Sequence, residues 1–288
     1  MPELPEVETV RRGLSGLIIG KVVKATDHDT PKGFPNAEQD VASFLIGATI
    51  TAIRRRAKVL IIDLSTEYSL VVHLKMTGQL VFVGESRFGA GHPNDSLVNA
   101  LPDKSTRVTI EFEDDSKLFF NDQRKFGWVR LMPTIEVPNL PFMQKVGPEP
   151  LEDSFTVEAF AARFARRRRT NIKAAILDQS VVAGVGNIYA DESLWGAKIH
   201  PTRLVESITE KEFGLLYHEL RAVMNLSIEK GGSSNRNYVN AEGKKGSYMD
   251  FARVFRREGL PCPRCGTTIE KTRVAGRGTH ICPFCQKV

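Results

Sequence analysis

The sequence has no hydrophobic run that approaches the ~18 residues a membrane-spanning helix needs, although hydrophobic residues make up 41% of its 288 positions. Its acidic first residues contain no apolar stretch of the kind found in secretory signals, and the chain has no internal repeat. Charged residues account for 26%, a composition typical of globular rather than disordered proteins. We therefore expect a folded cytosolic protein without a membrane partner.

Cysteine is missing from the whole chain except its last 27 residues, which contain all four. In a reducing compartment such clustering favours a metal site over disulfides. Two residues separate Cys262 from Cys265 and Cys282 from Cys285, and a spacer of 16 residues joins the pairs. This spacing predicts a structural zinc site, because four thiolates fill the tetrahedron and leave no open position for catalysis. A redox or disulfide role is the alternative.

Acidic residues are in short supply only in the second half of the chain. Residues 1–150 carry 18 basic and 19 acidic side chains, whereas the remainder carries 22 and 15, so the net charge of +6 arises there. A basic C-terminal half indicates a polyanionic partner, most often a nucleic acid. The alternative is a basic surface that serves solubility alone.

The N-terminal half is predicted to be a helix followed by short strands. Val7, Val10, Leu14 and Leu17 form one apolar face of a helix over residues 4–18. Segments rich in β-branched and aromatic residues predict strands at 58–65, 68–75, 78–83, 106–112, 117–122 and 128–132. Residues 84–105, rich in Gly, Pro, Asn and Ser, are predicted to be an inserted loop. Because no long helix interrupts the strands, a β-sandwich or barrel is favoured over a βαβ sheet.

The C-terminal half has a helical pattern. We expect helices at 154–169, capped by Ser154 or Thr156, and at 171–179, 186–197 and 207–232. The last begins with Ser207 and Glu210 at capping-box spacing and ends at Gly231–Gly232. The prediction is an α+β multidomain chain with a helix and β-sandwich domain (1–133), a proline-rich linker (134–150), a helical domain (151–254) and a zinc β-hairpin (255–288).

Several residues have both a structural and a functional interpretation. Pro2 and the acids behind it suit a helix entrance, but trimming of the initiator methionine would also expose a secondary amine beside carboxylates. Met76 and Phe126 suit either a protein core or a wedge in a base stack. Four arginines at 166–169 suit a solvated helix end or a phosphate-binding surface. Residues 184–186 form a glycine-containing helix junction whose free N–H groups suit a phosphate, although plain junctions also use glycine.

Seven motifs occur in one order along the chain. They are PELPEVETVRRGL, RRRAKVLIIDL, HLKMTGQL, NDQRKFGW, GPEPL, DQSVVAGVGNIYADESLW and GRGTHICPFCQ. From residue 2 to about 287 the chain closely resembles the bacterial formamidopyrimidine-DNA glycosylase family, which repairs oxidised purines. The N-terminal, Asn187 and zinc-hairpin motifs are shared with the endonuclease VIII family, whereas PELPEVE and GPEPL are similar to the formamidopyrimidine branch. The resemblance implies a leading helix and β-sandwich, a helix–two-turn–helix domain and a zinc finger.

The resemblance also implies which residues carry the chemistry. Pro2 would be the nucleophile that attacks the sugar C1′, and Glu3 the catalytic glutamate beside it. Lys58 would assist base departure and β-elimination, and Arg277 of the zinc hairpin would serve δ-elimination. Glu6 would be a supporting acid near the active site. Without the resemblance, Lys58 is most simply a strand-end cation and Glu6 an acid that complements the helix dipole.

Contacts with damaged double-stranded DNA follow from the same resemblance. Met76, Arg124 and Phe126 would fill the gap left by a flipped base, with Arg124 bonded to the orphaned cytosine. Phosphates would be held by Arg168, Lys173, Asn187 and Arg277. Residues 232–251 are similar to the family's lesion-recognition loop. One structural Zn²⁺ and no nucleotide cofactor are implied, and we expect a monomer that is associated with the bacterial nucleoid through DNA.

The chain departs from the family's pattern at three positions and in one insertion. Val59 follows the predicted catalytic lysine where a tyrosine is common, and Ser105 stands where a DNA-contacting histidine is expected. Ser105 can donate one neutral hydrogen bond but carries no charge. His280 follows the GRGT motif where aromatic residues are common, and residues 84–105 are longer than in some relatives. Since none of these changes touches the predicted nucleophile, its glutamate and lysine, or the cysteines, we expect activity to survive.

Three functions therefore compete. The first is a bifunctional glycosylase and abasic-site lyase that excises 8-oxoguanine and formamidopyrimidines through a proline Schiff base and nicks the strand by β,δ-elimination. The second is an endonuclease VIII-like glycosylase for oxidised pyrimidines, and the third is a non-catalytic zinc-ribbon protein that only binds DNA. The order and extent of the motifs favour the first.

Overall fold

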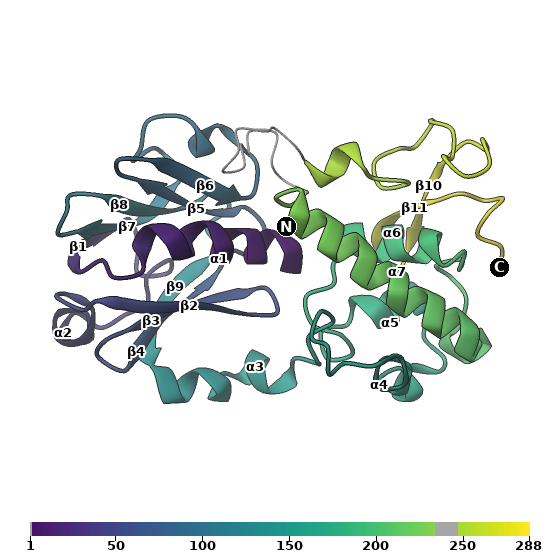
Figure 1. Cartoon of the computed structure of the whole chain (residues 1–288), viewed down its shortest axis with the longest axis horizontal. Coiled ribbons are helices and arrows are strands. Elements are labelled where there is room, and N and C mark those ends of the chain that lie inside the picture. Colours follow the sequence, from purple (N-terminus) through teal and green to yellow (C-terminus); the bar gives the residue numbers. More distant parts are fainter. Residues whose placement is uncertain (1, 234–246) are drawn as a thin grey trace. The chain divides into compact units, whose positions relative to one another are not determined.

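The computed structural model describes residues 2–233 and 247–288, which form two compact units (Figure 1). The first unit contains Met1–Gln144 and Lys230–Ser247, and the second contains Lys145–Glu229 and Tyr248–Val288. The helical segment and the cysteine-rich segment therefore share one unit. Most of the predicted lesion-recognition loop, residues 234–246, lies outside the described residues.

The first unit is the predicted β-sandwich with a leading helix, α1 (Leu4–Ile18). One antiparallel sheet has the strand order β2–β3–β4–β9 and the other has the order β1–β7–β8–β5–β6. The strands are β1 (Val23–His28), β2 (Ile50–Arg56), β3 (Val59–Leu64), β4 (Tyr68–His73), β5 (Gly78–Val83), β6 (Arg87–Gly91), β7 (Thr106–Phe112), β8 (Lys117–Asp122) and β9 (Trp128–Pro133). Short helical segments lie at α2 (Glu38–Asp40), η1 (Val41–Leu45) and η2 (Asp95–Leu97).

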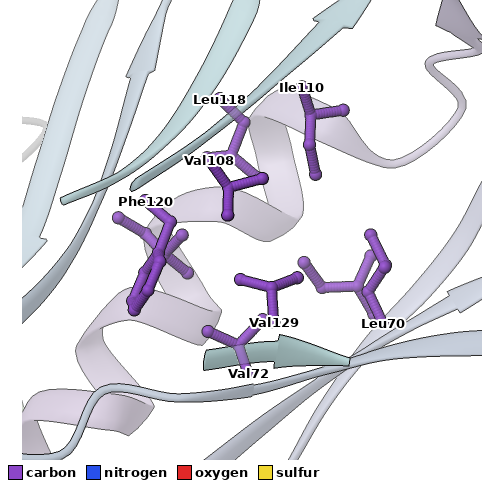
Figure 2. Close-up of a pocket in the computed structure, with 9 residues that line it drawn as sticks. Leu70, Val72, Val108, Ile110, Leu118, Phe120 and Val129 are labelled. Atoms are coloured by element: carbon purple, nitrogen blue, oxygen red, sulfur yellow. The ribbon is translucent and has the colours of Figure 1, made fainter. Parts of the chain in front are cut away.

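The main core fills the space between the two sheets (Figure 2). Alternate residues along each strand point to one face, so the apolar set of every strand can turn inward together. From the four-stranded sheet come Leu70, Val72 and Val129, and from the five-stranded sheet come Val108, Ile110, Leu118 and Phe120. Each of these side chains is at most 4% exposed, and burial of each contributes ~1.5–3 kcal/mol to folding.

Helix α1 packs along the side of the sandwich where an edge strand of each sheet lies. Its apolar residues Val7, Val10, Leu14 and Ile18 are fully buried in the main core. The helix contacts β2 and β6, the edge strands of the two sheets. The helix that carries the N-terminal motif is therefore fixed to both sheets.

Three strands of the sandwich, β1, β2 and β6, were not predicted from the sequence. β1 and β2 expose many polar side chains, so their apolar pattern is weak. β6 lies within residues 84–105, where a loop was predicted, and that prediction is wrong over residues 87–91. Gly91, at a φ of +126°, lets β6 approach β5, since a Cβ there would lie 2.6 Å from the carbonyl oxygen of Gly78. A glycine-rich edge strand contains few of the β-branched and aromatic residues from which strands are predicted.

Residues 134–143, in the predicted proline-rich linker, are folded onto the four-stranded sheet. η3 (Thr134–Asn139) and α3 (Pro141–Lys145) follow β9. Val137 and Leu140 pack in a small second core with Val59, Ile61 and Val71. These strand residues face away from the sandwich interior, so the segment covers the outer face of the sheet.

The second unit is helical and ends in a β-hairpin. Its elements are α4 (Val157–Ala162), η4 (Ala165–Arg167), α5 (Ile172–Leu177), α6 (Asn187–Gly196), η5 (Val205–Ser207), α7 (Glu210–Glu229), η6 (Tyr248–Asp250), β10 (Glu270–Val274) and β11 (Arg277–Ile281). Helix α7 packs on α4 and α6, and α6 packs on α5 and β11. Over the described part of the chain, no helix combines the length and apolarity needed to span a membrane.

The helix predicted over residues 154–169 is shorter in the structure. It ends at Ala162, and Ala165–Arg167 form a 3₁₀ turn, so the four arginines do not lie on one α-helix. Arg167 turns back to form an ion pair of 2.6 Å with Asp178. Thr156, one of the two predicted caps, accepts the N–H of Ala159 at 3.3 Å.

The capping box of α7 lies two residues after the predicted one. The N–H of Thr209 donates to Glu212 at 2.9 Å, and the N–H of Glu212 donates to the Thr209 hydroxyl at 3.3 Å. Ser207 and Glu210 have the same spacing, but Ser207 is the last residue of η5 and Glu210 is the first residue of α7. The spacing alone allows both registers, and the backbone of the preceding turn selects one.

Candidate functional site

Pro2 and Glu3 lie at the N-terminal end of α1, and both are buried. Glu3 is the N-cap residue, and Glu6 Oε2 accepts its backbone N–H at 2.8 Å within a capping box. The Glu3 side chain is 3% exposed. The structure therefore brings three predicted site residues together in one helical turn, with a buried carboxylic acid next to the proline.

Glu6 also contacts a distant part of the chain. Its Oε1 accepts both the backbone N–H and the hydroxyl of Ser233, each at 2.8 Å. Gly232, next to Ser233, has a φ of +89°, a left-handed conformation that favours glycine. Glu6 thus connects the start of α1 to Ser233, at the beginning of the predicted lesion-recognition loop (residues 232–251).

Lys58 lies in the turn between β2 and β3 and is 8% exposed. Glu8 of α1 holds this turn through an ion pair of 3.2 Å with Arg55. Arg55 also donates to the carbonyl of Ala57, which has a left-handed φ of 52°. The predicted catalytic lysine is therefore fixed to the helix that begins at Pro2 and Glu3.

Glu8 is a site residue that sequence reasoning missed. Burial raises the pKa of Glu8, but hydrogen bonds from Arg11 and Arg12 and the charges of Arg11 and Arg55 outweigh it and lower the pKa to about 2. Spacings of three and four residues on a helix could have predicted the first two partners. The third partner, Arg55, belongs to strand β2, and no local pattern identifies it.

His73 is a second missed residue, in the strand next to Lys58. It lies opposite Val59 in the β3–β4 ladder. Burial lowers the pKa of His73 to about 3, and the charges of Lys75 and Lys58 lower it as well. His73 Nδ1 accepts the N–H of Lys75 at 3.1 Å, so the ring is neutral at pH 7 with its proton on Nε2. The HLKMTG motif contains this histidine, but nothing local separates it from a buried strand residue.

Met76, Arg124 and Phe126 lie on two loops at one end of the five-stranded sheet. We call these loops, residues 74–77 and 123–126, the β5–β8 tip. Gly78 and Asp122, from which the loops extend, face each other in the β5–β8 ladder. Met76 is 38% exposed and Phe126 is 45% exposed, and the Arg124 guanidinium lies 4.8 Å from the Phe126 ring centroid. Exposed apolar side chains beside a cation fit the wedge interpretation better than the core interpretation.

Ser105 is 3% exposed and is used inside the protein. Its hydroxyl donates to Asp103 at 2.7 Å and lies 2.9 Å from the hydroxyl oxygen of Ser96. Its carbonyl accepts the N–H of Asp122 at 2.8 Å. This geometry does not support a direct contact between Ser105 and DNA, and instead gives the residue a role in the loop before β7.

The four cysteine thiols converge as predicted. The Sγ atoms of Cys262, Cys265, Cys282 and Cys285 lie within 4.8 Å of one another, and none is in a disulfide. Four sulfurs bound to one zinc ion at ~2.3 Å are about 3.8 Å apart, so the cluster fits the ion. Each pair is shaped by a backbone hydrogen bond, from Gly266 to Cys262 at 2.9 Å and from Gln286 to Cys282 at 3.0 Å. A closed set of four thiolates holds a structural zinc.

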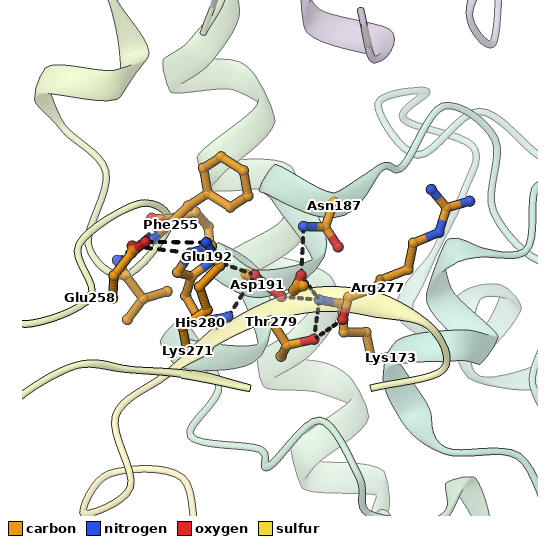
Figure 3. A network of polar contacts seen from close by, with 12 residues as sticks. Lys173, Asn187, Asp191, Glu192, Phe255, Glu258, Lys271, Arg277, Thr279 and His280 are labelled. Carbon is orange, nitrogen blue, oxygen red and sulfur yellow. Dashed lines mark hydrogen bonds and ion pairs between the residues drawn. The ribbon is translucent and has the colours of Figure 1, made fainter. Parts of the chain in front are cut away.

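Lys173 and Asp191 form a fully buried ion pair of 2.6 Å in the second unit (Figure 3). The ammonium also donates to the Thr279 hydroxyl at 2.7 Å and to the Gly278 carbonyl at 3.1 Å. Asp191 accepts the backbone N–H of His280 at 2.9 Å. Helices α5 and α6 thereby hold strand β11. Because Lys173 is 0% exposed, its geometry supports this positioning role and not a direct contact with phosphate.

His280 extends the same network. Its Nδ1 lies 3.2 Å from Asp191 and its Nε2 lies 3.3 Å from Glu258 (Figure 3). Its ring contacts Phe255 edge to face, with centroids 5.0 Å apart. The histidine that departs from the family's aromatic pattern is thus accommodated by two carboxylates on other elements.

Asn187 and Arg277 lie at the exposed end of this network. Asn187 is the first residue of α6, and its side-chain amide donates to the Gly278 carbonyl at 2.9 Å. Arg277, at the start of β11, is exposed, and Figure 3 shows its guanidinium directed away from the buried ion pair. The Arg168 side chain is 73% exposed and 3.8 Å from Glu206. The Arg168 and Arg277 side chains are accessible to a phosphate, whereas Asn187 is half-buried.

Three family profiles match successive parts of the chain. Residues 1–129 match the formamidopyrimidine-DNA glycosylase N-terminal domain, and residues 146–238 match the formamidopyrimidine-DNA glycosylase H2TH domain. Residues 259–288 match a zinc finger found in FPG and IleRS. The third match and the sulfur cluster agree on a structural zinc.

Relatives and solved structures match over the full length. A formamidopyrimidine-DNA glycosylase of Pediococcus pentosaceus is 41% identical over 286 residues, which are 99% of each chain. One of Desulforamulus reducens is 40% identical over 290 residues, which are 100% of this chain and 99% of the relative. A crystal structure of the Lactococcus lactis enzyme non-covalently bound to DNA with an abasic site has a TM-score of 0.85 and 34% identity, and covers 99% of this chain and 100% of that one. The predicted fold class is thereby confirmed, and the chain belongs to the formamidopyrimidine-DNA glycosylase family.

Proposed function

We propose that the protein is a bifunctional DNA glycosylase and abasic-site lyase of base excision repair. It excises oxidised purines, 8-oxoguanine and formamidopyrimidines among them, and nicks the strand by β,δ-elimination. Family membership supports the substrate class. The observation that carries the mechanism is the buried Pro2–Glu3 end of α1, to which Glu8 ties the turn that contains Lys58.

The Pro2 nitrogen suits covalent catalysis once the initiator methionine is removed. An ordinary α-amino group has a pKa of ~7.7–8.0 and is partly neutral near pH 7, whereas a lysine amine at ~10.4 would need strong desolvation. Attack on C1′ forms the C–N bond as the glycosidic bond breaks, and the base leaves with the bonding electrons and a proton. Since the amine is secondary, the ring-opened product is a charged iminium, which serves as an electron sink.

Proton transfers complete the reaction. Glu3 adjoins the nucleophile and is the group that exchanges protons with the sugar during ring opening. Lys58 assists departure of the base and removal of the C2′ proton, which expels the 3′ phosphate by β-elimination. Arg277 serves the second elimination, which expels the 5′ phosphate. Glu6 supports this chemistry by holding the backbone of Glu3.

Binding to damaged duplex DNA uses both units. Met76 and Phe126 of the β5–β8 tip fill the gap left by the flipped nucleotide, and Arg124 bonds the orphaned cytosine. Arg168, Asn187 and Arg277 hold phosphates, and Lys173 acts through the hairpin that it anchors. The protein acts as a monomer on the bacterial nucleoid without a nucleotide cofactor.

A comparison of substrates tests this function. Single-turnover excision is measured on duplexes with 8-oxoguanine opposite cytosine and with thymine glycol opposite adenine, and the strand ends are analysed. We expect faster excision of 8-oxoguanine and a one-nucleotide gap with phosphate at both ends. Faster excision of thymine glycol would favour the endonuclease VIII-like function, and binding without cleavage of either duplex would favour the non-catalytic protein.

A further inference from the structure

A single carboxylate binds both loops of the β5–β8 tip. Asp122, the last residue of β8, is 1% exposed. Its Oδ1 accepts the Thr77 hydroxyl and the N–H of Arg124, the latter at 3.2 Å. Its Oδ2 accepts the N–H groups of Phe126 at 2.8 Å and Gly127 at 2.6 Å. Four donors, from the two loops and the adjacent Gly127, therefore converge on one buried side chain.

Thr77 completes the connection between the loops. Its hydroxyl donates to Asp122 and accepts the N–H of Arg124 at 3.0 Å. Thr77 is 8% exposed and directly follows Met76, whose side chain is 38% exposed. A buried hydrogen-bonded pair thus lies beneath three exposed side chains that are contributed by loops 47 residues apart in sequence.

The two loops need this support because their backbones are unfavourable for the residues present. Lys75 has a φ of 49° and Lys125 a φ of 55°, a left-handed conformation that costs a non-glycine residue ~1–2 kcal/mol. Gly127 permits the close approach of Asp122, since a Cβ at residue 127 would lie 2.6 Å from the Phe120 ring and 3.1 Å from Asp122 Oδ2. Loss of the carboxylate would leave the Thr77 hydroxyl and the N–H groups of Phe126 and Gly127 without their acceptor, and it would release both loops.

We infer that Asp122 is a positioning residue that, together with Thr77, sets Met76, Arg124 and Phe126 in one arrangement for entry into the base stack. The inference rests on the proposed function, in which these three side chains fill the gap. A wedge acts only when it is held in place, and a displacement of ~1 Å can cost ~100-fold in rate. Asp122 therefore matters when a base must be flipped and matters less when the substrate is already abasic.

The test compares two reactions of the full-length zinc-containing protein. One is single-turnover excision of 8-oxoguanine opposite cytosine, and the other is borohydride trapping on duplex DNA with an abasic site. For Asp122→Asn we expect excision to slow by about tenfold or more, while trapping changes by less than about threefold. The matched control is Asp114→Asn, because Asp114 caps the turn at the other end of the β7–β8 hairpin through Ser116. Asp114→Asn should excise like the wild type.

Thr77 supplies a second pair of variants in case Asp122→Asn does not fold. Thr77→Val keeps the side-chain shape and removes the hydroxyl, whereas Thr77→Ser keeps the hydroxyl. Slow excision by Thr77→Val with recovery in Thr77→Ser supports the inference. Wild-type excision by Thr77→Val, together with wild-type excision by any folded Asp122→Asn, overturns it.

Phe126→Ala separates failure of this inference from failure of the proposed function. If Phe126→Ala excises 8-oxoguanine as fast as the wild type, the tip does not act as a wedge and the proposed function of the three exposed side chains is wrong. If Phe126→Ala is slow while the Asp122 and Thr77 variants are not, the tip acts in DNA but Asp122 does not position it.

Discussion

Glu6 and Ser233 are joined by two hydrogen bonds of 2.8 Å, from the N–H and the hydroxyl of Ser233 to one carboxylate oxygen. The other carboxylate oxygen holds the N–H of Glu3 at 2.8 Å. These contacts give Glu6 a role beyond that of an acid near the positive end of a helix dipole. It links Glu3, the residue beside the proposed nucleophile, to Ser233, which lies 227 residues after Glu6.

Glu6→Gln should disturb this link. One acceptor oxygen becomes an NH₂ donor that faces an N–H group, and each lost hydrogen bond to a charged group costs ~1.5–3 kcal/mol. We expect a lower melting temperature and borohydride trapping slowed by about tenfold, because the Pro2–Glu3 end is less well held. Glu210→Gln, in the exposed first turn of α7, is the control. Unchanged trapping by Glu6→Gln would contradict the assigned role.

Lys173→Met should uncouple the hairpin from the helices. The substitution leaves Asp191 charged and buried, and removal of one partner of such a pair costs ~3–5 kcal/mol. We expect a large loss of stability and weaker binding to duplex DNA, and partial recovery of stability in the double variant with Asp191→Leu. Denaturant titration and fluorescence anisotropy measure the two effects, with the exposed Lys211→Met as control. A double variant no more stable than Lys173→Met would argue against the pair.

Loss of zinc should act on DNA binding through the hairpin. Cys262→Ser removes one of the four thiols, so metal analysis should fall below the one zinc per chain expected of the wild type. The strand that begins at Arg277 should then loosen, and affinity for duplex DNA should decrease. Wild-type zinc content together with wild-type affinity in Cys262→Ser would contradict a structural metal site.

The lowered pKa of His73 predicts how the free energy of unfolding depends on pH. Burial lowers the pKa of His73 to about 3 in the folded protein, whereas an unfolded histidine has a pKa of ~6.5. On acidification the unfolded chain therefore binds the proton first. The stabilisation is complete above pH ~6.5 and is lost as the pH falls towards 3, at up to ~1.4 kcal/mol per pH unit.

Denaturant titrations of His73→Phe test this dependence. The variant should show a flatter decline in the free energy of unfolding over this range than the wild type. His218→Phe, at an exposed position of α7, should keep the wild-type slope. Equal slopes in His73→Phe and the wild type would show that His73 does not stay neutral in the folded protein.

The parts of the fold that the sequence predicted are those with strong local patterns. α1 has an apolar stripe at helical spacing, and β3, β4 and β8 each contain an uninterrupted run of three or four apolar residues. β1, β2 and β6 are edge or polar strands whose pairing depends on neighbours far along the chain. The residues of β6 form a strand because β5 offers its free edge, and their own composition indicated a loop.

The residues of the candidate site also divide into those that a local sequence pattern identifies and those that depend on distant neighbours. The four cysteines were identified by spacing, and the remaining proposed site residues were identified or supported by motif resemblance. Glu8, His73 and Asp122 were missed, because each acts through partners from another element. The burial of Ser105 and Lys173 was not predicted either. Because both side chains are buried, they bind other residues of the protein. Local pattern therefore found the chemical groups but not the side chains that hold them.

The central claim is tested most directly by the site of covalent attachment to DNA. The protein is reacted with abasic-site duplex in the presence of borohydride, and the adduct is analysed by intact mass and peptide mapping. We predict one deoxyribose adduct, on the nitrogen of Pro2 in chains that have lost the initiator methionine, and no adduct of this kind in Pro2→Gly. An adduct mapped to Lys58 or another lysine, or strand cleavage at full rate by chains that retain the methionine, would contradict the account.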